Sequence, residues 1–324
     1  MKMKINPDWK NKEKWQENRD GFGKGLVALG ERNPRVVVLC ADLSKSTRAN
    51  LFRDKFPDRF FQFGVAEQNM MAAAAGMSLV GLIPFVCTYG VFATGRCFDQ
   101  LRVNVAYSNC NVKIEGAHSG VLVGPDGATH QALEDIALSR VLPNLIVIEP
   151  CDAIEARKAT LAMAEISGPV YIRLAREKIP VITAEDSPFS VGKANTLRQG
   201  KDAAVMACGP EVGEALGAAE VLEKEGIEVE VINLHTIKPL DKEAIISAAR
   251  KTGAVVTAEV HQVAGGMGSA VAEVLAQNCP VPMEMVGVKD RFGESGRPWE
   301  LMEKFGLTSK EIAAAIRRTL KRKK

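Results

Sequence analysis

Short, continuous apolar runs alternate with longer stretches of helical character along most of this 324-residue chain. The run at residues 36–41 shows the pattern, because it is wholly apolar and the polar segment 42–46 follows it directly. A run of this kind is typical of a parallel strand that is buried on both faces. Since strands that alternate with helices form doubly wound parallel sheets, the pattern predicts an α/β fold.

The first part of the chain is expected to form one such sheet. Strands are predicted at 36–41, near 61–63, and at 83–88, 112–115, 145–149 and 170–174. Helices are predicted at 19–32, from 67, at about 92–106, after 131 and from 153. Residues 116–130 are expected to form a loop.

A break near residues 182–201 separates this pattern from a second one. It contains Pro188, Gly192 and Gly200 but no long periodic segment. Beyond it, strands are predicted at 202–207, 228–233, 254–259 and 283–288, with helices at 211–226, after 241 and after 268. We therefore expect two doubly wound domains, at residues 1–187 and 188–324, each a mostly parallel sheet with helices on both faces.

Composition argues against several classes of function. Hydrophobic residues make up 46% and charged residues 25% of the chain, as in ordinary globular proteins, and the net charge of +3 is too small to argue for nucleic acid. No apolar run reaches the roughly 18 residues of a membrane span. The seven cysteines form no CxxC pair, which favours reduced thiols over a zinc site. With no signal-peptide pattern at the start, we expect a cytoplasmic protein without nucleic-acid or membrane partners.

Glu67 is a single acid at the start of a predicted helix that is otherwise apolar, with Met70, Met71 and four alanines following it. A buried carboxylate is costly unless it is paired or protonated. A buried carboxyl group can exchange a proton with a ligand, which is general acid–base work. The alternative is that Glu67 only caps the helix, whose N-terminus favours negative charge.

Further polar residues follow the predicted strands, at the sheet edge where open α/β proteins bind ligands. The loop at 116–131 holds His118 and His130 between glycines, which let a backbone approach a ligand closely. A solvated loop with capping side chains is the alternative. The candidate set is Arg19, Asp42, Ser46, Glu67, His118, Asp126, His130 and Arg176.

Two segments, FGVAEQN at 63–69 and GPDGATHQ at 124–131, together resemble the pyrimidine-binding half of transketolase. The resemblance covers essentially the whole chain, because the family's C-terminal domain follows in the same order. It implies that Glu67 binds N1′ of the aminopyrimidine of thiamine diphosphate. It also implies the transfer of a two-carbon ketol unit from a ketose phosphate to an aldose phosphate, with the cofactor supplying the chemistry.

The resemblance assigns roles to other residues one by one. Tyr89 and Phe92, in TYGVF at 88–92, would stack on the pyrimidine ring, whereas the third aromatic residue of the family falls on Gly95. In ADLSKS at 41–46, Asp42 would lie near the cofactor and Ser46 at the substrate phosphate.

The remaining family positions concern the sugar phosphate. Arg19, His118 and Arg176 would bind the phosphate, and an arginine suits it because the guanidinium donates two parallel hydrogen bonds. Asp126 and His130 would hydrogen-bond the sugar hydroxyls and assist proton transfer. Glu67, Asp126 and His130 are thus the expected catalytic residues.

The family's Gly-Asp-Gly segment, which holds Mg²⁺ and the diphosphate, is absent from this sequence, and so is a Walker A motif. We therefore expect no metal ligand here. An N-terminal transketolase subunit would carry that segment, and the resemblance implies two copies of each chain. Residues 265–269 resemble a nucleotide loop, but a tight turn before a helix is favoured. His235 and His261 are given no catalytic role.

Three alternatives stay open. The β subunit of a 2-oxo acid dehydrogenase has the same domain order but would not need Ser46, His118 and Arg176 together. One half of a deoxyxylulose phosphate synthase has a similar histidine loop. A non-catalytic homologue that only binds a partner would have no need for Glu67.

Overall fold

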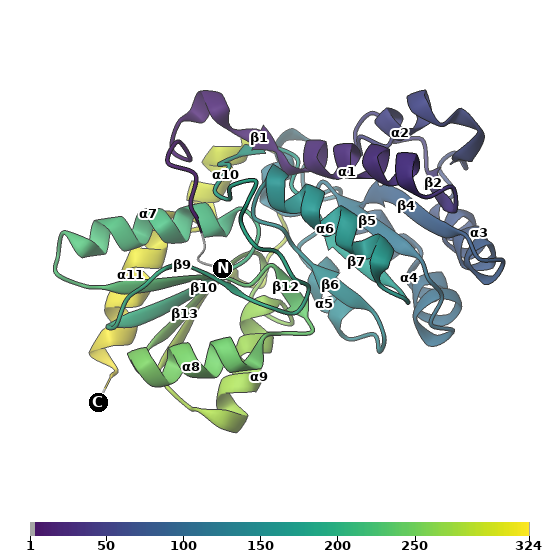
Figure 1. Ribbon diagram of the computed structural model, residues 1–324. Helices are drawn as coiled ribbons and strands as arrows, with labels where there is room; N and C mark the ends of the chain where they lie inside the picture. Colours follow the sequence, from purple (N-terminus) through teal and green to yellow (C-terminus); the bar gives the residue numbers. More distant parts are fainter. Residues whose placement is uncertain (1–3, 324) are drawn as a thin grey trace.

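The computed structural model describes residues 4–323, which form two α/β lobes side by side (Figure 1). Among these residues the first lobe has a seven-stranded sheet in the order β12-β6-β7-β5-β4-β2-β3, and the second has a five-stranded sheet in the order β14-β13-β10-β11-β9. Neighbouring strands are parallel except for β12 with β6 and β9 with β11. The predicted fold class is confirmed.

The central strands of both sheets are the short apolar runs of the sequence, and β2 (Val36–Cys40) is buried along its whole length. The other strands of the first sheet are β3 (Phe60–Gln62), β4 (Ile83–Tyr89), β5 (Lys113–Ala117), β6 (Ile146–Ile148), β7 (Val170–Arg173) and β12 (Thr236–Lys238). The second sheet contains β9 (Asn195–Arg198), β10 (Ala203–Ala207), β11 (Val229–Asn233), β13 (Val255–Gln262) and β14 (Met283–Val288). A separate antiparallel pair joins β1 (Gln16–Glu17) to β8 (Lys178–Ile179).

Helices cover both faces of each sheet, as an apolar sheet requires. One face of the first sheet packs against α1 (Asn18–Arg32), α2 (Asn50–Lys55) and α6 (Ala153–Glu165). The opposite face packs against α3 (Glu67–Leu79), the π-helices η3 (Phe92–Arg96) and η4 (Leu101–Tyr107) with α4 (Phe98–Gln100) between them, and α5 (Asp135–Arg140). Short 3₁₀ turns are η1 (Lys12–Lys14), η2 (Pro57–Arg59) and η5 (Val121–Asp126).

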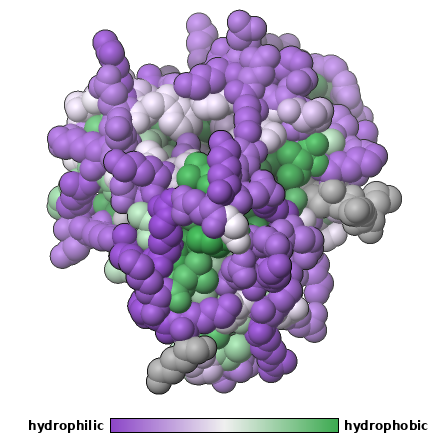
Figure 2. All heavy atoms as spheres, turned by 90° about the vertical axis from the view of Figure 1, so that its left-hand side faces the viewer, coloured by the Kyte–Doolittle hydropathy of each residue, from purple (hydrophilic) through white to green (hydrophobic). Residues whose placement is uncertain are grey.

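In the second lobe, α7 (Glu211–Glu223) and α11 (Ser309–Lys321) lie on one face of the sheet. The other face packs against α8 (Lys242–Thr252) and α9 (Met267–Asn278), and α10 (Pro298–Lys304) precedes α11. Seen from the side of this lobe, polar side chains cover most of the surface, and apolar ones are exposed in a narrow central strip (Figure 2). No helix within residues 4–323 combines the length and the apolarity needed to cross a bilayer.

Three details differ from the sequence-based expectations. The helix expected at about 92–106 is broken into π and α segments. The break at 182–201 contains the edge strand β9. Strand β12, from the later part of the chain, pairs with β6 of the first sheet. A domain boundary between 187 and 188 therefore stays a prediction.

The two lobes share a continuous apolar core. The cluster under α3 contains Leu39 and Val86 of the first sheet, and it also contains Ala204 and Met206 of β10 in the second. Buried apolar area is the main favourable term in folding. Because part of that area lies between the lobes, the lobes stabilise each other in one fixed arrangement.

Candidate active site

Glu67 is the first residue of α3, and only 1% of its surface is exposed. Nη1 of Arg96, which comes from η3, donates to both carboxylate oxygens at 2.9 and 3.0 Å. The residue before α3, Ala66, supplies no side-chain cap. The buried acid thus has two favourable interactions. One is with the N-terminus of its own helix, and the other is an ion pair with a cation from a different segment.

A cavity of about 390 Å³ opens beside this pair. Asp42, Phe92 and His130 line it together with Glu67 and Arg96. Asp42 follows β2, η3 follows β4, and His130 lies in the loop after β5. The cavity therefore lies at the carboxyl edge of the parallel sheet, where successive strands deliver side chains to one place.

Four rings from this edge stack or meet edge to face. The rings of Tyr89 and Phe92 stack with centroids 5.8 Å apart, and the ring of His118 stacks on Tyr89 at 4.0 Å. His130 meets Phe92 edge-on at 5.4 Å and Tyr89 at 6.0 Å. Such arrangements fix the planes of the rings relative to one another. The expected aromatic residues thus form one rigid group with the two histidines.

Arg19 joins this group to the segment after β2. It donates to the backbone carbonyl of Ser46 at 2.6 Å, forms an ion pair with Glu17 at 2.9 Å, and lies 3.4 Å from Nε2 of His118. Burial and the nearby Arg19, Arg176 and Arg48 lower the pKa of His118 to about 2. His118 is therefore neutral, and since Nε2 faces a donor, we assign its proton to Nδ1, which is buried without a partner among the described residues.

Arg176 lies next to Asp126, with Nη1 and Oδ1 3.5 Å apart, and it also donates to the carbonyl of Val123. Both side chains are partly exposed. Arg176 borders a second cavity of about 680 Å³, which it shares with Pro125, Arg297 and Pro298. Of the expected site residues, all of which the structure describes, only Asp42, Glu67, Phe92 and His130 line the cavity at Glu67; those that do not are Arg19, Ser46, Tyr89, His118, Asp126 and Arg176.

Backbone strain also gathers at this edge. Asp42, Arg48 and His118 have φ angles of 59°, 62° and 53°, in the left-handed region that residues other than glycine seldom adopt. Each such residue costs about 1–2 kcal/mol in backbone energy. Strain of this kind is kept where a side chain has to be held in one particular direction.

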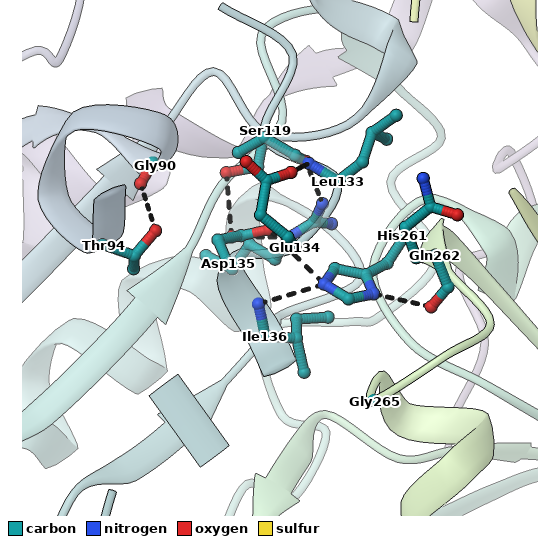
Figure 3. Close-up of polar contacts among 12 residues, drawn as sticks. Gly90, Thr94, Ser119, Leu133, Glu134, Asp135, Ile136, His261, Gln262 and Gly265 are labelled. Atoms are coloured by element: carbon teal, nitrogen blue, oxygen red, sulfur yellow. Dashed lines mark hydrogen bonds and ion pairs between the residues drawn. The ribbon is translucent and has the colours of Figure 1, made fainter. Parts of the chain in front are cut away.

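A buried polar network fixes the loop that carries both histidines. Ser119 donates to Asp135 at 3.3 Å (Figure 3). Nε of Arg173 donates to the same carboxylate at 2.9 Å. Nη1 of Arg173 donates to Glu149, and Nη2 donates to the backbone carbonyls of Ala132 and Val260. Since Val260 belongs to β13, this arginine ties the loop to the second lobe.

His261 of β13 completes the contact between the lobes. Its Nε2 accepts the backbone N–H of Ile136 at 3.2 Å, and its Nδ1 lies 2.7 Å from the carbonyl of Gln262 (Figure 3). Burial lowers the pKa of His261 to about 4. The ring is therefore neutral and takes part in the packing between the lobes. His235 is also buried and packs against Phe189 at 4.4 Å.

In the glycine-rich segment, Gly265 and Gly266 form the expected turn, and residues 267–269 are the first turn of α9. The buried carboxylate of Glu259 accepts the N–H groups of Met267 at 2.6 Å and Gly268 at 2.8 Å. An acidic side chain of the chain itself thus takes up the N–H groups at the helix N-terminus, where a nucleotide phosphate would otherwise be favoured, and burial raises the pKa of Glu259 to about 8.

Sequence reasoning missed three charged residues of the site, namely Arg96 on Glu67, and Glu17 and Arg48 beside Arg19. Arg96 had one indirect signal, because the preceding Gly95 stands where an aromatic residue was expected. Glu17 and Arg48 had none, since the contacts depend on how α1 approaches the loop after β2.

The site has a buried acid beside stacked rings, and it lies at the carboxyl edge of the sheet in the first of two α/β lobes. Comparison with known protein families identifies the class of protein that has these features. Residues 15–181 match the pyrimidine binding domain of transketolase, and residues 192–312 match the transketolase C-terminal domain. The chain belongs to the transketolase family.

Within that family the chain aligns over nearly its whole length with C-terminal subunits and sections. It is 45% identical to a 6-deoxy-6-sulfo-D-fructose transketolase subunit of Clostridium sp. (strain MSTE9), over 94% of this chain and 95% of the relative. It is 43% identical to a putative transketolase C-terminal section of Methanocaldococcus jannaschii, over 94% and 96%. A solved split-gene transketolase, described as an inactive β4 tetramer, shares 48% identity and a TM-score of 0.88 over 95% of this chain and 99% of that one.

Proposed function

We propose that the chain is the C-terminal subunit of a thiamine diphosphate-dependent split transketolase, which moves a two-carbon ketol unit from a ketose phosphate to an aldose phosphate. The observation that carries the proposal is the cavity in which buried Glu67 lies with Phe92 and His130. Family membership and alignment with split subunits support it.

The residues of this cavity fit the aminopyrimidine of the cofactor. Glu67 is an acid held away from water, Phe92 lines the same cavity with an aromatic ring, and Tyr89 stacks on that ring from behind the cavity wall. In this proposal Glu67 holds a proton at the ring nitrogen, the aromatic planes orient the ring, and Asp42 lies at its margin. When bound, thiamine diphosphate would supply the nucleophilic carbon for the ketose carbonyl.

The substrate is proposed to occupy the path from this cavity toward Arg19 and Arg176. Arg19, Ser46, His118 and Arg176 would bind the phosphate, with His118 neutral rather than charged. His130 and Asp126 would bind sugar hydroxyls and move protons near the bond that breaks. These assignments place the cations at the outer end of a sugar chain, where its anionic group would lie.

The terminal anion of the substrate has a second candidate. The relative from Clostridium is named for a sugar that carries a sulfonate in place of a phosphate. Both groups present oxygens that arginine binds well. A sulfonated ketose is therefore the second donor to test.

The Mg²⁺ ion and the diphosphate are proposed to bind an N-terminal transketolase subunit, with two copies of each chain in the complex. The solved relative is described as a β4 tetramer that is inactive, which supports a requirement for another kind of chain. The active site would then be formed between the two kinds of subunit.

The test is an assay of the chain with the subunit that copurifies with it. With thiamine diphosphate and Mg²⁺, we expect glyceraldehyde 3-phosphate from xylulose 5-phosphate plus ribose 5-phosphate, and only when both chains are present. Glu67→Ala should abolish turnover and preserve the fold. Glu185→Ala, which removes an exposed acid paired with Arg157, serves as the control.

Other outcomes select the alternatives. Oxidative turnover of a 2-oxo acid would indicate a dehydrogenase β subunit, and condensation of pyruvate with glyceraldehyde 3-phosphate would indicate a deoxyxylulose phosphate synthase. No turnover of any of these substrates would indicate a non-catalytic homologue.

A further inference from the structure

Arg96 lies between the buried acid of the site and the solvent. Its side chain is 44% exposed, whereas that of Glu67 is 1% exposed. Its guanidinium also lies over the ring of Phe92, 4.1 Å from the centroid. A single side chain thus contacts Glu67 and Phe92, two of the residues that the proposed function assigns to the aminopyrimidine ring.

The backbone places Arg96 there through the π-helix η3. Gly95 occupies the position of the expected third aromatic residue, and a Cβ atom built on it would meet no atom within 4 Å. No side chain within residues 4–323 fills that side of the wall. The guanidinium of the next residue covers the adjacent aromatic face instead, as π-bulges at functional sites often re-aim a side chain.

The contact with Arg96 conflicts with the role proposed for Glu67. An arginine that donates to both oxygens favours the ionised carboxylate, whereas exchange of a proton with a ring nitrogen requires the acid form. Arg96 and the ring nitrogen therefore cannot bind the carboxyl group of Glu67 at the same time. Arg96 is free to turn toward water, because its side chain is long and half exposed, but Glu67 has no such route.

We propose that Arg96 is a positioning residue that occupies Glu67 in the cofactor-free chain and is displaced from it when the aminopyrimidine binds. This inference rests on the proposed function. Arg96 keeps the buried acid paired while the cavity is empty of cofactor, and its departure releases the carboxyl group to take up a proton.

The first experiment tests the pair without any cofactor. Thermal unfolding of the free chain is measured for Arg96→Met, Glu67→Gln and the double variant. We expect Arg96→Met to lower the melting temperature in the wild-type background and to have almost no effect in the Glu67→Gln background. Equal shifts in both backgrounds would show that Arg96 does not hold Glu67.

The second experiment measures thiamine diphosphate binding to the complex with its copurified subunit, by calorimetry in the presence of Mg²⁺, from pH 6 to pH 8.5. Arg96→Met should bind about tenfold more tightly than wild type at high pH, since no charge-assisted hydrogen bond has to break. The difference should shrink as the pH falls, because acid supplies the proton to both proteins. Arg96→Lys keeps a cation and should behave more like wild type. Arg53→Met removes an exposed arginine that pairs with Asp54 on α2, and it should bind the cofactor as wild type does.

Two failures are distinguishable. If the wild-type complex binds thiamine diphosphate and Arg96→Met binds equally or more weakly at every pH, Arg96 contacts the cofactor or does nothing, and the displacement is refuted. If the wild-type complex binds no thiamine diphosphate, the proposed function fails, and the displacement fails with it.

Discussion

Arg176 contacts a backbone carbonyl and a carboxylate, and it is not part of a buried ion pair. It contacts Val123 and Asp126, and both its side chain and that of Asp126 are about 30% exposed. A guanidinium held so loosely can turn to an incoming anion at little cost, since partly exposed ion pairs are weak. This is the geometry expected of a ligand-binding arginine rather than of a structural one such as Arg173.

Arg176→Ala should raise KM for phosphorylated sugars by about 10- to 100-fold with a smaller effect on kcat, because it removes charge-assisted hydrogen bonds that bind the phosphate throughout the reaction. The measurement is steady-state kinetics with phosphorylated and unphosphorylated donors. Arg297→Ala is the matched control, since Arg297 borders the same cavity but is 85% exposed. Equal losses with both kinds of donor would exclude a phosphate contact.

At the scale of elements, the approach of α1 to α6 sets where Arg19 lies. The helices touch at Gly21, where a Cβ atom would come within 1.9 Å of the carbonyl oxygen of Ala153. Only a residue without a side chain permits this approach. Because Arg19 is two residues earlier on the same helix, the contact also determines its distance from Ser46 and His118.

Gly21→Ala should destabilise the free chain by about 1–3 kcal/mol, because the added methyl group forces the helices apart. Urea unfolding measures the effect. Gly76→Ala is the control: Gly76 lies in α3, and a methyl group added there would meet no atom within 4 Å, so the change should be neutral or stabilising by up to about 1 kcal/mol. If both variants unfold alike, the close approach of α1 and α6 contributes nothing to stability.

The elements that the sequence predicted well are those whose residues are buried on both sides. The run at 36–41 was predicted as a buried strand and forms β2, and the glutamate at 67 was predicted to start a helix and is the first residue of α3. The edge strands β9 and β12 were missed because they are short and partly polar. The π-helices were missed because an extra residue in a turn leaves the apolar spacing nearly unchanged.

The same reasoning separates the predictable from the unpredictable parts of the site. His118 and His130 were grouped because they lie in one loop after a predicted strand, whereas Tyr89 and Phe92 were added only through the resemblance to transketolase. The structure stacks the rings of Tyr89, Phe92 and His118 and places His130 edge-on to them. The pairing of Arg96 with Glu67 was not predictable, because it joins residues 29 positions apart through an irregular helix. The roles of these residues stay predictions until variants are assayed.

At the scale of the whole molecule, neutral His261 makes the junction between the lobes sensitive to acid. Its pKa of about 4 in the folded chain lies below the ordinary value of 6.5. Between these values the unfolded chain binds a proton that the folded chain does not. Stability is therefore fully present above about pH 6.5 and falls as the pH decreases, by about 1.4 kcal/mol per pH unit for this one group.

We expect the free energy of unfolding to fall less steeply with acid in His261→Gln, by about 2 kcal/mol between pH 6.5 and pH 5. Urea unfolding of both proteins at several pH values provides the comparison. His118 titrates in the same direction, but it is present in both proteins and cancels. Parallel pH profiles would mean that His261 gains a proton without unfolding the junction.

The strand order of the first sheet has a consequence for how the chain can be divided. One edge strand of this sheet is β12, in which Thr236 lies opposite Ile148 of β6. In the sequence, β12 comes after the first strands of the second lobe. A fragment that stopped before β12 would leave β6 as an open edge, ready to pair with another molecule. The later part of the chain therefore supplies the strand that completes the sheet of the first lobe.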